Sequence, residues 1–174
     1  LVPGAQTVNP NEVDTAFGIA GKKFNIPIMA AAMDGVVDVK FAVAMSKLGG
    51  IAVLNLDGVQ TRYENPEAVL EKIAKAQARQ ATELIQSIYS TPIKNKLISK
   101  RIKEIKQKKG TAAVSCIPAH AQEFSKLAVA AGADILVIQS TVATTRHLSK
   151  EYRSLDLFKF CKSVKIPVII GNCV

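Results

Sequence analysis

Three cysteines and two histidines are the residues best able to supply a nucleophile and a base in this 174-residue chain. Cys116 and Cys173 each follow an apolar run, whereas Cys161 lies inside a helical pattern. A reactive cysteine needs a partner that lowers its pKa, and the sequence places no histidine and asparagine recognisably around any of the three. We interpret Cys173 as a small packing residue, and His120 and His147 as surface residues. The spacing of the cysteines does not predict a metal site or a disulfide framework.

Five short apolar runs, each followed by small or polar residues, indicate where binding residues could lie. The runs are Pro27–Ala31, Ile51–Leu54, Thr111–Ser115, Asp134–Ile138 and Pro167–Ile170. They are continuous rather than alternating, which is typical of parallel strands buried on both faces. In parallel barrels the active site lies at the carboxyl ends of the strands. We therefore expect binding residues in the segments after the runs: Ala32–Gly35, Asn55–Gly58, Cys116–Ala119, Gln139–Thr141 and Gly171–Val174.

Helical patterns between the runs supply the elements that would position these segments. The predicted helices run from the Asp38 cap to Leu48, from the Asn65-Pro66 start, over Ala119–Ala131, and over Leu155–Val164 with Ser154 as cap. Alternating strands and helices predict an α/β fold with a parallel sheet. The first run lacks the glycine-rich turn of dinucleotide-binding open sheets, which favours a barrel. A complete barrel needs about 250 residues, so only about five βα units fit in this chain.

The net charge of +9 is concentrated in one segment, Lys94–Lys109, which holds eight basic residues and one acidic residue. The wider stretch Gln80–Gly110 is weakly amphipathic, and we expect one or two extra helices or a partly mobile excursion there. No aromatic residue is interleaved with the lysines, so we interpret the segment as a solvated face and expect no nucleic-acid partner. No apolar run approaches the roughly 18 residues of a membrane span, and no signal peptide is visible. We expect a cytoplasmic protein without a membrane partner.

Four motifs in order along the chain resemble strands of the IMP dehydrogenase family. Asn25–Val36 resembles the family's first strand and the small-small-Met-Asp turn after it. Leu48–Asn55, Ala131–Ile138 and Val168–Asn172 resemble the second, fourth and fifth strands. Further segments resemble the bacterial IMP dehydrogenase-related subfamily without CBS domains: Leu1–Gly4, Val13–Thr15, Asn55–Gly58, Thr61–Pro66 and Val137–Val142.

The resemblance implies that residues 1–174 are the N-terminal portion of a parallel (β/α)8 TIM barrel. Residues 80–110 would stand where related enzymes carry a tandem CBS module, for which about thirty residues are too few. The implied activity is the oxidation of IMP to XMP with NAD. The alternatives are a GMP reductase using NADPH, a more distant flavin-binding barrel oxidase, or an inactive nucleotide-binding regulatory protein.

The family's catalytic cysteine, mobile flap and monovalent-cation site belong to later βα units, so we assign no catalytic residue and no metal ligand to this chain. We expect the 174 residues alone to be inactive, with exposed sheet edges at Pro27–Ala31 and Pro167–Ile170. The resemblance also implies a homo-oligomer, a tetramer in most members.

The resemblance assigns two groups of binding residues. Ala31, Met33, Gly171 and Asn172 would contact the purine nucleotide, and Asn55, Gln139, Ser140 and Thr141 would contact NAD. Met33 would pack against the purine base, or alternatively only fill the barrel mouth. Asp34 could bind substrate or bond to the backbone of its own turn. Gln139 stands where most members have an acidic residue, so this position brings no negative charge to the cofactor.

Overall fold

A five-stranded parallel sheet is the centre of the fold in the computed structural model, which describes residues 4, 6–19, 21–143 and 155–173. Its strands lie in chain order: β3 (Met29–Ala30), β4 (Ile51–Asn55), β5 (Ala113–Cys116), β6 (Ile135–Ala143) and β7 (Val168–Cys173). Each neighbouring pair is parallel. A doubly wound sheet would reverse its strand order, and this sheet does not. The five apolar runs are therefore strands of a partial barrel, as predicted, and β3 and β7 form its two edges.

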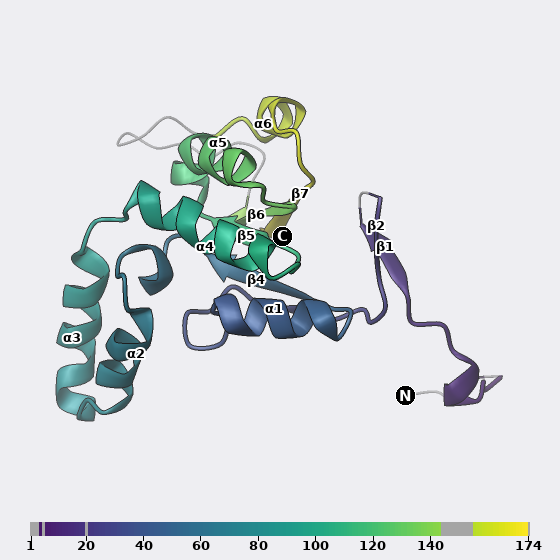
Figure 1. The fold of residues 1–174 in the computed structure, drawn as a ribbon, viewed down its shortest axis with the longest axis horizontal. Helices are drawn as coiled ribbons and strands as arrows, with labels where there is room; N and C mark the ends of the chain where they lie inside the picture. Colours follow the sequence, from purple (N-terminus) through teal and green to yellow (C-terminus); the bar gives the residue numbers. More distant parts are fainter. Residues whose placement is uncertain (1–3, 5, 20, 144–154, 174) are drawn as a thin grey trace.

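Some of the helices pack against the outer face of the sheet, whereas a projecting pair does not (Figure 1). The bounds of the helices are α1 (Val39–Lys47), α2 (Pro66–Ala74), α3 (Ala78–Ser90), α4 (Asn95–Gln107), α5 (Ala121–Ala131) and α6 (Leu157–Ser163). Short 3-10 turns occupy η1 (Pro10–Glu12), η2 (Val59–Thr61) and η3 (Pro118–His120). The main core joins the outer face of the sheet to α1, α4 and α5. No helix in the described part of the chain is long and apolar enough to cross a membrane.

The predicted helix boundaries are confirmed where a side chain caps the helix. The Asp38 carboxylate accepts a hydrogen bond from the Phe41 amide at 2.7 Å, and Asn65 accepts one from Ala68 at 3.2 Å. Gly132 ends α5 with a φ of 90°, a conformation that glycine adopts without strain. The last helix is shorter than predicted, because Asp156 caps it through the Lys159 amide at 3.0 Å. Ser154 and His147 lie outside the described residues.

The segment between β4 and β5 contains a helical hairpin and a core helix. Helices α2 and α3 project on the side of the molecule opposite the N-terminal strands (Figure 1). The prediction of weak amphipathicity was wrong for α4, which buries one face against α1 and α5. The buried residues of α4 are Leu97, Ile98, Arg101, Ile102 and Ile105. The other positions of α4 carry only charged or polar residues, so the helix is amphipathic.

An N-terminal antiparallel hairpin, which the sequence analysis did not predict, packs against apolar residues near the starts of the strands. It consists of β1 (Phe17–Ile19) and β2 (Lys22–Phe24). Phe24 is buried in a second core cluster with Ile51, Val53, Ala113 and Ile135. Strands of three residues are too short to be recognised from hydrophobic periodicity. The hairpin closes the end of the partial barrel where the strands begin.

Asp134, which precedes β6, connects this end of the sheet to two lysines. Its carboxylate accepts hydrogen bonds from the Ala112 amide and Lys106 Nζ, each at 2.8 Å, and lies 2.9 Å from Lys22 Nζ. Burial alone would raise the pKa of Asp134, but the hydrogen bonds from Lys106, Ala112 and Lys22 lower it below the ordinary value of 3.8. Because the folded-state pKa is the lower one, the ionised form stabilises the fold above the unfolded-state pKa.

We therefore expect the Asp134 contribution to stability to be lost as the pH falls from about 4 through the depressed folded-state pKa. Urea unfolding between pH 6 and pH 3 should show a smaller loss of stability for Asp134→Asn than for the unmodified protein. Glu83→Gln on the exposed surface of α3 is the matched control. An identical pH dependence in all three proteins would show that the pairing of Asp134 contributes nothing.

Candidate functional site

The predicted binding residues all lie at one end of the sheet. Because the strands are parallel, their carboxyl ends share that end. Ala31 and Met33 follow β3, Asn55 ends β4, Gln139, Ser140 and Thr141 lie in β6, and Gly171 and Asn172 lie in β7. Gln139 and Gly171 are paired across β6 and β7. The structure therefore places these residues on a common rim, which we call the strand-end face.

The strand-end face presents apolar and neutral polar groups. The Met33 side chain is 57% exposed and Ile117, after β5, is 41% exposed. Gln139, Thr141 and Asn172 are also exposed. The Ser140 hydroxyl oxygen is buried and has no hydrogen-bond partner among the described residues. Apolar side chains and a few neutral hydrogen-bonding groups are residue types that commonly line ligand sites.

Asp34 joins the loop after β3 to the loop after β4. Its Oδ2 accepts hydrogen bonds from the Val59 amide at 3.0 Å and from the Tyr89 hydroxyl. A Cβ atom added to Gly58 would lie 1.9 Å from Asp34 Oδ1, so only glycine allows the carboxylate to approach this closely. The alternative that Asp34 bonds to the backbone of its own turn was wrong. The carboxylate instead binds the backbone of the neighbouring loop.

Asp57 joins the loops after β4 and β5 in a similar way. Its carboxylate accepts a hydrogen bond from the Ile117 amide at 2.8 Å, and Oδ1 lies 2.5 Å from His120 Nδ1. The Asn55 side-chain oxygen accepts from the Asp57 amide at 2.9 Å, so this oxygen already has a protein partner. The amide nitrogen of Asn55 is the donor that could make the predicted cofactor contact. The sequence analysis missed the Asp57–His120 pair, because no local pattern links residues 63 positions apart.

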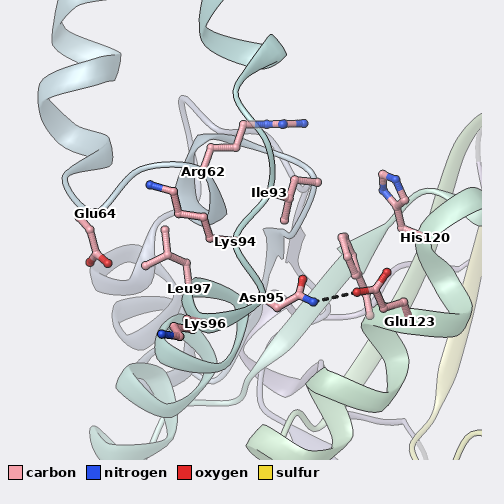
Figure 2. A pocket seen from close by; sticks show the side chains of 10 residues that line it. Arg62, Glu64, Ile93, Lys94, Asn95, Lys96, Leu97, His120 and Glu123 are labelled. Atoms are coloured by element: carbon pink, nitrogen blue, oxygen red, sulfur yellow. Dashed lines mark hydrogen bonds between the residues drawn. The ribbon is translucent and has the colours of Figure 1, made fainter.

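An open cleft of about 720 Å³ lies beside this network, at the amino-terminal ends of α4 and α5. Figure 2 shows Arg62, Lys94 and His120 among its lining side chains. The Arg62 guanidinium donates to the Asp57 and Thr91 carbonyl oxygens. Asn95 and Glu123 bind each other at 2.8 Å across the cleft (Figure 2). Several of its polar groups therefore already serve the protein structure, and we place the candidate site at the strand-end face.

Neither described cysteine side chain has the environment of a nucleophile. Cys116 is 1% exposed at the end of β5. Burial, with a smaller contribution from the Asp57 charge, raises the pKa of its thiol to about 12. Cys161 lies on the exposed surface of α6, away from the strand-end face. Among the described residues no group of three or more histidine, cysteine or acidic side chains could hold a metal ion.

The strand order and direction define a class, the partial parallel (β/α)8 barrel. The chain belongs to the IMP dehydrogenase / GMP reductase family, whose domain model matches residues 1–174. It superimposes on the IMP dehydrogenase/GMP reductase-like protein of Corynebacterium glutamicum with a TM-score of 0.90 and 28% identity, over 98% of this chain and 46% of that one.

Curated relatives agree with this assignment. An uncharacterized oxidoreductase of Mycobacterium tuberculosis is 31% identical over 177 residues, which cover 99% of this chain and 47% of the relative. An inosine-5'-monophosphate dehydrogenase of Methanocaldococcus jannaschii is 46% identical over 55 residues, 32% of this chain and 11% of the relative. The chain thus spans about half the length of the oxidoreductases that it matches from end to end.

Proposed function

We propose that this chain forms the nucleotide-binding part of a purine nucleotide oxidoreductase that converts IMP and NAD into XMP and NADH. The observation that carries the proposal is Met33, a large apolar side chain that is 57% exposed at the strand-end face of a family member. An exposed methionine beside a ligand site provides a polarizable surface for a flat base. Ala31 leaves space next to it, while the neutral amide of Asn172 and the backbone at Gly171 would bind the polar edges of the nucleotide.

The residues of β6 fit a dinucleotide cofactor. The Ser140 hydroxyl, which has no hydrogen-bond partner in the described part of the chain, and the exposed Gln139 and Thr141 side chains offer hydrogen bonds to hydroxyl and carboxamide groups without adding charge. The amide nitrogen of Asn55 completes the proposed set. The nicotinamide group, when bound, supplies the hydride acceptor. The role of this chain's residues is to bind and orient the two ligands, and the chain contributes no catalytic cysteine to the proposal. Family membership also supports proposing a cytoplasmic homotetramer and a monovalent cation bound by none of the residues named here.

A GMP reductase that uses NADPH is the second candidate, because the matched family contains both activities. The two are distinguished by assaying the complete gene product with IMP plus NAD and with GMP plus NADPH, following nicotinamide absorbance. Formation of NADH with IMP would support the proposal. Oxidation of NADPH with GMP would replace it by the reductase. Nucleotide binding without either reaction would instead indicate a regulatory protein.

Met33→Ala tests the proposed binding surface. Loss of the apolar contact should weaken nucleotide binding about tenfold, or roughly 1.4 kcal/mol, as expected for part of a methionine side chain. Leu48→Ala is the matched control, since Leu48 is 67% exposed but lies at the opposite end of the sheet, just before β4. Titration calorimetry with IMP measures both variants. Equal affinities of the two variants for IMP would show that Met33 does not contribute to nucleotide binding.

A further inference from the structure

Helix α3 directly contacts the loop that carries Met33. The Tyr89 hydroxyl, near the end of α3, donates a hydrogen bond to Asp34 Oδ2, 55 positions away in the chain. Asp34 is the residue immediately after Met33. The carbonyl oxygen of Met33 in turn accepts hydrogen bonds from the Val36 and Val37 amides, each at 2.9 Å. Helix α3 is thus connected to the proposed purine-binding residue Met33 by the hydrogen bond between Tyr89 and Asp34 and by the peptide bond between Asp34 and Met33.

Few interactions other than the Tyr89 hydrogen bond hold the Asp34 side chain in its position. Its other hydrogen bond comes from the Val59 amide, and the second oxygen, Oδ1, is buried without a partner among the described residues. Gly58, which has no Cβ atom, leaves room for the carboxylate at this position. Tyr89 therefore provides the only side-chain hydrogen bond to Asp34 in the described part of the chain.

Tyr89 itself is held in an orientation suited to this role. The Arg62 guanidinium carbon lies 5.8 Å from the centre of the Tyr89 ring. Burial, followed by the hydrogen bond to Asp34 and the Asp34 charge, raises the pKa of Tyr89, so the hydroxyl remains a proton donor at neutral pH. Arg62 also donates to Asp57, so the same arginine contacts both loop networks of the strand-end face.

We propose that Tyr89 is a positioning residue, through which helix α3 fixes Asp34 and thereby the Met33 loop for nucleotide binding. This inference rests on the proposed function. It makes the α2–α3 hairpin part of the nucleotide site, although none of its residues lies on a strand.

The test is Tyr89→Phe in the complete gene product, which keeps the ring and removes the hydroxyl. The KM for the nucleotide should rise about tenfold, the effect of losing a hydrogen bond to a charged group, while kcat changes by less than about twofold. Tyr63→Phe is the matched control. The Tyr63 hydroxyl bonds to the Ile88 carbonyl at 3.0 Å and to Thr91 Oγ1 at 2.7 Å, so it anchors the same end of α3 without touching Asp34. It should leave KM within about twofold.

A second measurement separates this inference from the proposed function. Amide hydrogen exchange of Val36 and Val37, measured without nucleotide, should accelerate in Tyr89→Phe and not in Tyr63→Phe. Adding Tyr89→Phe to Asp34→Ala should then have no further effect on that exchange. An enzyme that uses no purine nucleotide would overturn the proposed function and the nucleotide role of Tyr89. Unchanged exchange in Tyr89→Phe, or an unchanged KM in an active enzyme, would overturn the positioning role alone.

Discussion

Replacement of Arg101 by alanine is expected to lower the free energy of unfolding by about 3–5 kcal/mol. Arg101 is 7% exposed on α4. Its guanidinium donates to the carbonyl oxygens of Gln60 at 3.0 Å, Tyr63 at 3.2 Å and Glu64 at 2.8 Å, and pairs with Glu104 at 3.1 Å. Alanine would leave several of these carbonyl groups without a partner. The cost should be large because most of the lost bonds join a buried cation to backbone that cannot rearrange.

Lys103→Ala is the control for this effect, because Lys103 is an exposed cation on the same helix. It should change the stability by less than about 0.5 kcal/mol. Urea denaturation at constant salt measures both variants. If the two substitutions had equal effects, the basic residues of Lys94–Lys109 would be interchangeable surface charges. The predicted difference would show that Arg101 instead fixes η2, and with it the loop after β4 at the strand-end face.

The Cys116 thiol should react with iodoacetamide about a thousandfold more slowly than an ordinary thiol. The thiolate is the reactive form, and a pKa of about 12 rather than 9.0 reduces the thiolate fraction by roughly three orders of magnitude near neutral pH. Steric protection of a side chain that is 1% exposed acts in the same direction. Mass spectrometry of the alkylated peptides measures the rate.

Cys161 provides the internal reference for this experiment, since it is exposed on α6 of the same molecule. In urea both cysteines should react at similar rates, because unfolding removes the burial and the neighbouring charge. Rapid alkylation of Cys116 in the folded protein would contradict the buried environment and would reopen its assignment as a nucleophile. Slow alkylation would agree with a structural role for Cys116.

The strands and most helix boundaries were predictable because their signals are local. Continuous apolar runs at βα spacing identified all five strands of the parallel sheet. Asp38 and Asn65 cap the helices that their positions predicted, and Gly132 ends α5. Since strand ends of a parallel sheet share one edge, the same signals also placed Met33 and the other proposed binding residues on a common face.

Only the tertiary structure determined which polar residues hold that face together. The Asp57–His120 and Asp34–Tyr89 pairs join residues far apart in sequence, so no periodicity or motif records them. The burial of Arg101 within a lysine-rich helix likewise depends on which side of α4 packs against η2. The sequence by itself determines whether a segment forms a strand or a helix, because hydrophobic periodicity and helix capping depend on residues that are close together in the chain. The partners of individual polar side chains follow from how those segments pack, which is a property of the whole chain.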